Sequence, residues 1–397
     1  MSNMDITIRI AGENGEGVLS VGETLAEALA RTGLNVYTFK NLPAEIKGGA
    51  SMIQVRVSDR PVRSPGDAID ILMAWNQENY DLHLEDLREG GIVLYDPSAC
   101  EPDQTMPYTQ LPAPLDRIIK EEIKVTRSKN VLAFGILTAY IGIPVEIAER
   151  MVRESRWGRR KEFLESNIQA LHAGYRYVRE EITRDGVALT LPEKPIERRM
   201  ILTGNEAFCL GAIAAGCQYY AGYPITPASD IMETLAKNLP KVGGVVVQTE
   251  DEIAALASVI GASFAGKKAM TATSGPGLSL MVEELGLATM YELPIVVVNV
   301  QRGGPSTGMP TKVEQADLDL AVYGHHGDAP RIVIAPYDVE GCFYTAIQAF
   351  NLAEQYQVPV IVLSDQHISQ RSEVTQRPDI SQITVRNRLT PPHDATN

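Results

Sequence analysis

The stretch VQTEDEIAALASVIGASFAGKKAMTATSGPG, residues 247–277, decides the fold of the second half of the chain. It contains an acidic helix start, a helix of small residues, a short strand and a glycine-rich turn, which together predict one βαβ unit. Crossovers of this kind bring loops together at one edge of a parallel sheet, where ligands of open α/β folds usually bind. One carboxylate in the stretch, Glu252, distinguishes an enzyme from an ordinary α/β scaffold.

Helices and strands alternate cleanly around this stretch. The apolar run at 295–300 indicates a strand that is buried on both faces, and residues 339–353 and 358–363 add a helix and a further strand. A parallel sheet flanked by helices is the architecture that fits so regular an alternation. We therefore expect an α/β domain over residues 201–370.

Several loops of this domain follow strands and should meet at one edge of the sheet. They are residues 223–227, 249–252, 273–277 and 302–311. Together they supply hydroxyls, carboxylates, a guanidinium and many backbone N–H groups, a set that suits an anionic substrate. The loops contain neither a Ser-His-Asp arrangement nor the spacing of metal ligands.

Glu252 allows a structural and a functional interpretation. Thr249-Glu250-Asp251-Glu252 matches the capping box T-x-x-E, in which the glutamate folds back onto the N–H of the cap residue. The helix behind it is rich in alanine and serine, which permits very close packing. Such packing would press the carboxylate against a flat ligand or another chain. The pattern alone leaves both interpretations open.

The first domain begins as a Rossmann-like unit. Isoleucines at every second position from 6 to 10 indicate a strand, and a glycine-rich loop and a helix follow it. The loop glycines Gly12, Gly15 and Gly17 have the order G-x-x-G-x-G, which reverses the dinucleotide fingerprint. Lys40 stands where that fingerprint expects an acidic residue. Three interpretations stay open: a tight turn, an NAD site, or a site for another phosphorylated ligand near Lys40 and Lys47.

A basic run in the first domain is a further candidate for contact with phosphate. It consists of Arg150, Arg153, Arg156, Arg159, Arg160 and Lys161. Such a run usually forms the solvated face of a helix. The basic run is therefore either a solvated helix face or a docking site for phosphate.

Length and composition limit the class of protein. A chain of 397 residues suits two domains, which we place at 1–186 and 201–370, with a linker at 187–200 and a polar tail at 371–397. The net charge of −14 argues against a nucleic-acid surface. Four scattered cysteines exclude a dense disulfide framework and an iron–sulfur cluster bound by this chain alone. Neither a signal peptide nor a membrane span is visible, so we expect a cytoplasmic protein.

Certain motifs occur in an order known from one family. They are G-Y-P-I-T-P at 222–227, Q-T-E-D-E-I-A-A at 248–255, T-A-T-S-G-P-G at 271–277 and Q-R-G-G-P-S-T-G-M-P-T at 301–311. They resemble the pyrimidine-binding domain of the 2-oxoacid:ferredoxin oxidoreductases. The first domain is similar to the gamma domain of that family. The fused gamma–alpha order is typical of the alpha subunit of 2-oxoglutarate:ferredoxin oxidoreductases.

The resemblance implies a thiamine diphosphate enzyme and assigns roles to individual residues. Glu252 matches the glutamate that hydrogen-bonds the aminopyrimidine ring of the cofactor. Thr226 matches the hydroxyl that contacts the 2-oxoacid, and Arg302 matches the arginine that holds the substrate carboxylate. The other residues expected at the cofactor are Tyr223, Pro224, Ser274, Gly275 and Gly277.

The gamma domain of the family is associated with coenzyme A. The candidates for contact with it in this chain are Gly12, Gly15, Gly17, Lys40 and Lys47. The implied reaction is the oxidative decarboxylation of a 2-oxoacid to an acyl-CoA and CO₂, with reduction of ferredoxin. The domain order favours 2-oxoglutarate, although pyruvate and branched-chain 2-oxoacids fit the same threonine and arginine.

Two motifs of the complete enzyme do not occur in this sequence. The G-D-G motif of the diphosphate and magnesium site and a cluster-binding cysteine set do not appear. The resemblance therefore implies a beta subunit that carries Mg²⁺ and a [4Fe-4S] cluster, in an (alpha-beta)₂ heterotetramer that is active only as a complex. Alpha subunits of this type usually continue into a further small domain, so we expect a truncated or split subunit. A non-catalytic binding module and an NAD-dependent dehydrogenase are the alternative functions.

Overall fold

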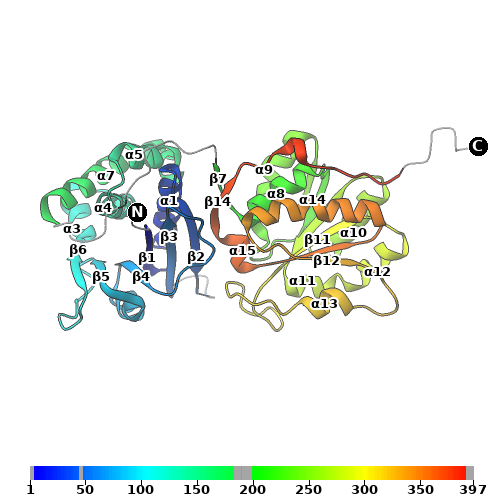
Figure 1. The fold of residues 1–397 in the computed structure, drawn as a ribbon, viewed down its shortest axis with the longest axis horizontal. Coiled ribbons are helices and arrows are strands. Elements are labelled where there is room, and N and C mark those ends of the chain that lie inside the picture. Colours follow the sequence, from blue (N-terminus) through cyan, green and yellow to red (C-terminus); the bar gives the residue numbers. More distant parts are fainter. Residues whose placement is uncertain (1–3, 44–47, 183–188, 190–198, 390–397) are drawn as a thin grey trace, which may run out of the picture. The chain divides into compact units, whose positions relative to one another are not determined.

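The computed structural model describes residues 4–43, 48–182, 189 and 199–389 (Figure 1). The chain divides into two compact units. Unit 1 comprises Met1–Ile201 and Ser372–Val374, and unit 2 comprises Leu202–Arg371 and Thr375–Asn397. Each unit contains a sheet with helices packed on it, so the predicted α/β class is confirmed. Within the described residues, no helix is both long enough and apolar enough to cross a membrane.

The described strands of unit 1 form one mixed sheet. They are β1 (Asp5–Glu13), β2 (Asn35–Asn41), β3 (Ala50–Ser58), β4 (Ile69–Ala74), β5 (Leu87–Tyr95), β6 (Thr109–Pro112), β7 (Arg199–Thr203) and β14 (Ser372–Gln376). They lie in the order β6-β5-β4-β1-β3-β2-β14-β7. β1, β4, β5 and β6 are parallel, as in a Rossmann-like unit, whereas β3 is antiparallel to both β1 and β2. The alternating isoleucines predicted β1, but the sequence analysis placed β14 in a polar tail and did not predict the antiparallel half of the sheet.

Most helices of unit 1 cover the face of the sheet that carries the isoleucines of β1. They are α1 (Val18–Arg31), α3 (Leu115–Ile118), α4 (Lys129–Ile141), α5 (Val145–Glu154), α6 (Arg156–Arg159) and α7 (Lys161–Glu181), whereas α2 (Gln77–His83) packs into a smaller cluster on the other face. Ile6, Ile8 and Ile10 share one core cluster with the buried residues of α1 and α4. The period-two pattern of the sequence therefore predicted the buried face of β1 correctly.

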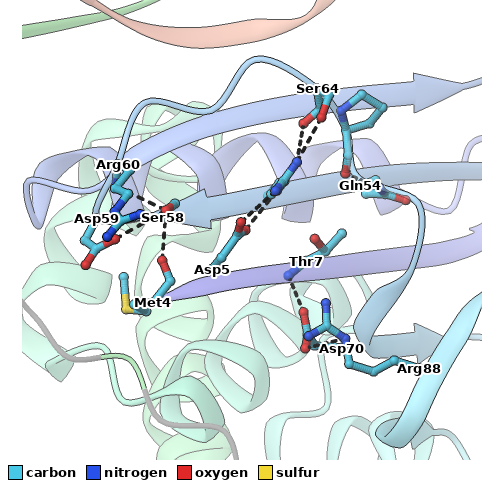
Figure 2. Close-up of polar contacts among 12 residues, drawn as sticks. Met4, Asp5, Thr7, Gln54, Ser58, Asp59, Arg60, Ser64, Asp70 and Arg88 are labelled. Atoms are coloured by element: carbon cyan, nitrogen blue, oxygen red, sulfur yellow. Dashed lines mark hydrogen bonds and ion pairs between the residues drawn. The ribbon is translucent and has the colours of Figure 1, made fainter. Parts of the chain in front are cut away.

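The opposite face of this sheet carries polar side chains at the amino-terminal ends of β1 and β4 (Figure 2). The Thr7 amide donates a 2.7 Å hydrogen bond to Asp70, and Arg88 forms a 2.9 Å ion pair with the same carboxylate. Asp5 pairs with Arg56 at 2.6 Å. Burial raises the pKa of Asp70. Because these groups satisfy one another, the other, carboxyl-terminal edge of the parallel strands is the better place for a ligand.

The described strands of unit 2 form a parallel sheet in the order β12-β13-β11-β10-β8-β9. They are β8 (Tyr219–Gly222), β9 (Val245–Gln248), β10 (Ala269–Thr273), β11 (Ile295–Gln301), β12 (Ile332–Ile334) and β13 (Val360–Asp365). Every pairing in this sheet is parallel. β11 is buried on both faces, as its continuous apolar run predicted.

Two groups of helices cover the two faces of this sheet. α8 (Gly204–Ala214), α9 (Ser229–Asn238) and α14 (Val339–Tyr356) pack against one face, and α10 (Glu252–Phe264), α12 (Val282–Met290) and α13 (Leu318–Tyr323) pack against the other (Figure 1). The short helices α11 (Gly275–Leu280) and α15 (Gln366–Gln370) follow β10 and β13 directly. Successive residues of β10 and β11 alternate between the two core clusters, which is the pleat of a strand buried on both sides.

The segment predicted as a polar tail, residues 371–397, takes part in the fold as far as it is described. β14 pairs with β2 in unit 1 through Glu373 and Tyr37. In unit 2, Arg388 pairs with Glu354 at 2.8 Å and donates a 2.8 Å hydrogen bond to the carbonyl of Ser263 at the end of α10. Of the predicted linker, residues 187–200, only Leu189, Arg199 and Met200 are described.

Candidate functional site

The carboxyl-terminal edge of the unit 2 sheet gathers most of the residues predicted for the cofactor and the substrate. The predicted loops follow β8, β9, β10 and β11, and these strands are parallel neighbours. Thr273 of β10 lies beside Asn299 of β11 in the parallel register, so the loops that follow them leave the sheet at the same edge. The site is therefore assembled by the parallel topology from segments far apart in the sequence.

Glu252 is the first residue of α10 and does not cap it. The cap is Asp251, whose side chain accepts a 2.7 Å hydrogen bond from the Ala254 amide. Thr249 donates its hydroxyl to the Asp251 carbonyl at 2.9 Å. The capping-box interpretation of Glu252 was therefore wrong, because the cap lies two residues later than T-x-x-E requires. The Glu252 side chain is 6% exposed and receives no hydrogen bond from the described residues.

Gly277 makes room for the Glu252 carboxylate. A Cβ atom at this position would overlap the Thr273 hydroxyl and would lie 2.6 Å from Cγ and 2.7 Å from Oε1 of Glu252. No side chain larger than hydrogen fits there without displacing the carboxylate. The glycine-rich turn therefore also leaves the space that the Glu252 carboxylate occupies.

Arg302 lies across the same edge, at the start of the long loop after β11. Its two terminal nitrogens each donate a 2.6 Å hydrogen bond, one to the Thr226 carbonyl and one to the Thr307 carbonyl. Its Nε is buried and has no partner among the described residues. Burial lowers the pKa of Arg302, and the negative charge of Glu252 opposes that shift. The guanidinium therefore joins two loops within electrostatic reach of Glu252.

The other residues predicted at the cofactor lie on the same loops in different environments. Tyr223, Pro224 and Thr226 are exposed on the loop after β8. Ser274 is fully buried, and its hydroxyl donates a 2.8 Å hydrogen bond to the Val300 carbonyl, so this side chain fastens the turn to β11. Gly275 begins α11.

The sequence analysis missed a polar pair that supports this turn. Asn299 donates a 2.8 Å hydrogen bond to Asp317, and the Asp317 carboxylate lies 2.9 Å from the place of a Cβ atom at Gly275. Asn299 was hidden inside an apolar strand, and Asp317 lies beyond the loop in which candidates were sought. No group of three His, Cys, Asp or Glu side chains among the described residues is arranged to hold a metal ion.

Unit 1 contains a separate cavity of about 650 Å³ at the amino-terminal end of α1. Its cationic lining residues are Arg127, Lys129, Arg156 and Arg160, and its acidic ones are Glu16 and Asp116. Trp75, which follows β4, also lines the cavity, and its indole N–H is buried and has no partner in the part of the chain that the structure describes. A cavity with this surplus of cations, beside the start of a helix, suits an anionic ligand.

The glycine loop after β1 borders this cavity. Gly17 caps α1 with φ 97°, and a Cβ atom there would overlap the Asn130 side chain, which lines the cavity. Gly15 has φ 102° with open space around it, and a Cβ atom at Gly12 would lie 3.2 Å from Trp75 Cβ. The loop thus brings the start of α1 close to the cavity wall.

Lys40 and Lys47 were predicted to contact the phosphorylated ligand, and the structure bears on only one of the two predictions. Lys40 does not line the cavity, because its ammonium pairs with Glu23 at 2.8 Å. Lys47 lies outside the described residues. In their place, Arg156 and Arg160 come from the basic run of the sequence, where phosphate docking was one of two interpretations.

Two protein-family models match the chain. The model described as "Pyruvate ferredoxin/flavodoxin oxidoreductase" matches residues 7–177. The model described as "Pyruvate flavodoxin/ferredoxin oxidoreductase, thiamine diP-bdg" matches residues 210–397. The second match covers every unit 2 residue of the candidate site, and the first covers the cavity of unit 1.

Named relatives agree with these models. The 2-oxoglutarate oxidoreductase subunit KorA of Mycobacterium tuberculosis is 35% identical over 96% of this chain, and this chain spans 63% of its length. Subunit alpha of 2-oxoacid:ferredoxin oxidoreductase 2 from Aeropyrum pernix is 32% identical over 96% of this chain and 68% of its own length.

A solved structure shows the same likeness in three dimensions. It is 2-oxoglutarate:ferredoxin oxidoreductase from Magnetococcus marinus with 2-oxoglutarate, coenzyme A and succinyl-CoA bound. It is 44% identical, with a TM-score of 0.92, and the match covers 100% of this chain and 69% of that one. The arrangement of Glu252, Gly277 and Arg302 and these comparisons agree: the chain belongs to the family of 2-oxoacid:ferredoxin oxidoreductase alpha subunits.

Proposed function

We propose that this chain is the alpha subunit of a coenzyme A-dependent 2-oxoacid:ferredoxin oxidoreductase, with 2-oxoglutarate as the favoured substrate. The reaction converts the 2-oxoacid and coenzyme A to an acyl-CoA and CO₂ and reduces ferredoxin, and the proposal includes the reverse carboxylation. The observation that carries it is Glu252, a buried carboxylate beside Gly277 and Arg302 that has no hydrogen-bond partner among the described residues. The bound ligands of the Magnetococcus marinus relative support the choice of substrate.

The residues of unit 2 fit one half of a thiamine diphosphate site. Gly277 leaves space next to the Glu252 carboxylate, and that carboxylate is available to a ring nitrogen because the described residues give it no hydrogen bond. When bound, this cofactor supplies the carbon nucleophile that attacks a 2-oxo group and stabilises the charge left by decarboxylation. The role of Glu252 is to hold the aminopyrimidine ring and to exchange a proton with it. Tyr223, Pro224, Gly275 and the backbone at Ser274 complete this wall.

Arg302 and Thr226 are proposed to position the 2-oxoacid. Each terminal nitrogen of a guanidinium carries two hydrogens, and Arg302 uses one on each for the Thr226 and Thr307 carbonyls. The remaining hydrogens, together with the unpartnered Nε, can hold a carboxylate. Thr226 lies next to the Arg302 guanidinium, because its own carbonyl accepts one of these hydrogen bonds. Its hydroxyl can therefore reach the oxo or carboxylate oxygens of that acid.

The cavity of unit 1 is proposed to hold the phosphates of coenzyme A. Arg127, Lys129, Arg156 and Arg160 line it, and Trp75 offers an N–H that no described residue binds. The glycine loop brings the start of α1 to its edge, and helix starts favour phosphate. Lys40 is not part of this site, because it is paired with Glu23 and does not line the cavity.

Other components of the enzyme are proposed to come from other chains. A beta subunit carries the diphosphate and Mg²⁺ motif and a [4Fe-4S] cluster, in an (alpha-beta)₂ heterotetramer, and ferredoxin accepts the electrons. The support is the family, together with the sequence, which lacks the G-D-G motif and a cluster-binding cysteine set. The cytoplasm is the proposed location.

The test is a substitution that keeps the shape of Glu252 and removes its acid–base function. The chain is co-expressed with the beta-type subunit from the same source, and coenzyme A-dependent dye reduction is measured with 2-oxoglutarate, pyruvate and a branched-chain 2-oxoacid. Glu252→Gln should lower turnover roughly 100-fold or more, the usual effect of losing such a group. The highest kcat/KM is expected for 2-oxoglutarate.

A matched control separates the loss of the acid–base function of Glu252 from the general effect of removing one negative charge. Glu233→Gln removes an exposed carboxylate on α9 and should leave turnover unchanged. Urea unfolding of the Glu252→Gln chain should show that folding is intact, because the lost carboxylate makes no hydrogen bond with any residue that the structure describes. Wild-type turnover in Glu252→Gln would reject the proposed function.

A further inference from the structure

The turn between β10 and α11 contains two glycines that each make room for a carboxylate. At Gly277, a Cβ atom would lie 2.6 Å from Cγ of Glu252. At Gly275, two residues earlier, a Cβ atom would lie 2.9 Å from Oδ2 and 3.3 Å from Oδ1 of Asp317. Both glycines belong to the first turn of α11, so any movement of this helix changes the space around both carboxylates. The start of α11 is therefore packed between Asp317 and Glu252.

Asp317 and Ser274 each occupy the N-cap position of a helix, but neither side chain caps its helix. Aspartate and serine at this position usually accept a hydrogen bond from the first turn. The Asp317 carboxylate, at the start of α13, instead accepts a 2.8 Å hydrogen bond from the Asn299 side chain. The Ser274 hydroxyl, at the start of α11, donates instead to the Val300 carbonyl at 2.8 Å. Both cap residues thus contact β11 rather than their own helix, which indicates that they fix the position of α11 on the sheet.

β11 holds Asp317 through its backbone as well as through its side chain. The Asp317 amide donates a 3.0 Å hydrogen bond to Oε1 of Gln301, and Nε2 of Gln301 donates a 3.2 Å hydrogen bond to the Ser364 carbonyl of β13. Asn299 and Gln301 lie two positions apart on the strand, so their side chains share one face of the sheet. Asn299 is 0% and Gln301 4% exposed. Buried hydrogen bonds of this kind make Asp317 a fixed support rather than a mobile surface acid.

The support continues from Asp317 to the pocket of Glu252. Asn299 lies beside Thr273 in the parallel register of β11 and β10. The Thr273 hydroxyl occupies the space next to Gly277, where a Cβ atom would overlap it. Neighbouring side chains therefore connect Asp317 to Glu252 along the edge of the sheet. Loss of the contact at Asp317 should let α11 shift and change the space that the Glu252 carboxylate occupies.

We infer that Asp317 is a positioning residue of the cofactor site, which fixes α11 where Glu252 and the aminopyrimidine ring have room. This inference rests on the proposed function for the identity of the ligand. Asp317 takes no part in the chemistry itself, because Glu252 is the group that exchanges a proton with the ring. Binding of the 2-oxoacid should depend on Asp317 less than binding of the cofactor does, because Arg302 is held separately by the Thr226 and Thr307 carbonyls.

The test measures binding of thiamine diphosphate with Mg²⁺ to the cofactor-depleted complex with the beta-type subunit, by titration calorimetry, and dye reduction by the loaded complex. Asp317→Ala should weaken cofactor binding about 10-fold and lower kcat about 10-fold, because the wall of the pocket is displaced. KM for 2-oxoglutarate should change by less than about twofold. Asp317→Asn keeps an oxygen for the Asn299 hydrogen bond and should restore most of both losses. Gly275→Ala disturbs the same contact from the other side and should resemble Asp317→Ala.

Hydrogen exchange of the chain alone is a second readout, which needs no cofactor. Asp317→Ala should lower the protection of α11 amides such as that of Leu278, which donates a 3.0 Å hydrogen bond to the Ser274 carbonyl, and should leave α8 unchanged. Asp319→Ala is the matched control, because it removes an exposed acid from the same short helix, α13. Its cofactor binding, turnover and exchange should equal those of wild type.

The outcomes separate a positioning role from a general effect on stability or charge. Wild-type cofactor affinity in both Asp317→Ala and Gly275→Ala overturns the inference. An equal loss in Asp319→Ala, a loss of protection in Asp317→Ala that extends to α8, or a loss in Asp317→Asn as large as in Asp317→Ala also overturns it. Selective losses of α11 protection and cofactor affinity, combined with wild-type turnover of Glu252→Gln, support the role of Asp317 and reject the proposed function.

Discussion

The cavity of unit 1 and the edge of unit 2 differ in how far the chain's own residues satisfy their polar groups. In unit 1, Lys129 pairs with Asp116 at 2.7 Å, and the Arg127 guanidinium lies 5.0 Å from the centre of the Phe163 ring. In unit 2, the Glu252 carboxylate and the Nε of Arg302 are buried without hydrogen-bond partners among the described residues. The cations Lys129 and Arg127 thus have partners within unit 1, although the Trp75 indole N–H has none among the described residues, whereas at the unit 2 edge a carboxylate and a guanidinium nitrogen are left open.

This difference corresponds to two kinds of ligand. A cosubstrate that enters and leaves in every cycle needs a cavity that one chain can hold in shape by itself. A cofactor that stays bound between two chains can leave its contacts to be completed on assembly. Buried polar groups without partners are costly, so the open carboxylate and guanidinium nitrogen at the unit 2 edge agree with the proposal that a second chain completes this site.

The largest effect on the difference between the two sites is expected from a substitution that fills the space beside Glu252. Gly277→Ala places a methyl group against Thr273 and Glu252, so the carboxylate has to move. We expect turnover of the assembled enzyme to fall about 100-fold, because small displacements of positioning groups have effects of this size. The free energy of unfolding should fall by about 1–3 kcal/mol from overpacking. Turnover assays and urea unfolding measure the two effects.

The matched control for this substitution is Gly261→Ala on α10. A methyl group there meets nothing in this chain, and alanine is the better helix former. The chain alone should gain up to about 1 kcal/mol in unfolding free energy. Equal destabilisation by both substitutions would show that the space beside Glu252 is not special.

The fold was largely predictable because patterns of period two and of helix–strand alternation depend on short segments. The alternating isoleucines of β1 and the apolar run of β11 are examples. The antiparallel pairing of β2 with β3 was not predictable, since strand direction depends on which neighbour the chain meets after the turn. Local sequence carries burial periodicity but not the pairing partner.

The motifs led to candidate residues that lie at one edge of the unit 2 sheet, whereas local rules did not predict their contacts. T-x-x-E indicated a cap at Thr249, yet Asp251 also has a short polar side chain and caps α10 instead. Trp75 and Asn130 both line the unit 1 cavity although they lie far apart in the sequence, and no rule of residue spacing connects them. Contacts of this kind follow from tertiary packing, which the sequence of one chain does not reveal.

A smaller effect is expected when a cation that lines the unit 1 cavity is removed. Arg160→Ala removes an exposed guanidinium that lines the cavity. We expect the affinity for coenzyme A to fall about fivefold, which corresponds to about 1 kcal/mol for a solvated ion pair. The loss should shrink as salt is added, because screening weakens exposed charge pairs. Titration calorimetry at two ionic strengths measures both effects.

Arg159→Ala is the neighbouring control. Arg159 belongs to the same basic run and is exposed, but it does not line the cavity. Its removal should leave the affinity for coenzyme A unchanged within experimental error. A similar loss in both variants would mean that the run attracts the ligand only through its overall charge. Unchanged affinity in Arg160→Ala would place the phosphates elsewhere.

The smallest expected effect is an opposite dependence of the two units on pH. Burial lowers the pKa of His83 in unit 1 to about 4, and burial raises the pKa of Glu284 in unit 2 to about 7. Between pH 4 and 6.5 the unfolded chain binds a proton at His83 that the folded chain does not, so the stability of unit 1 rises with pH. Between pH 4.5 and 7 the folded chain binds a proton at Glu284 that the unfolded chain does not, so the stability of unit 2 falls with pH.

Hydrogen exchange can follow the two units separately in the same sample. Peptides from β1 should gain protection from pH 5 to 7 and peptides from β10 should lose it, each by about 1–2 kcal/mol after correction for intrinsic exchange. His83→Gln should flatten the first profile and Glu284→Gln the second. If each profile kept its slope in the matching variant, groups other than His83 and Glu284 would carry the pH dependence.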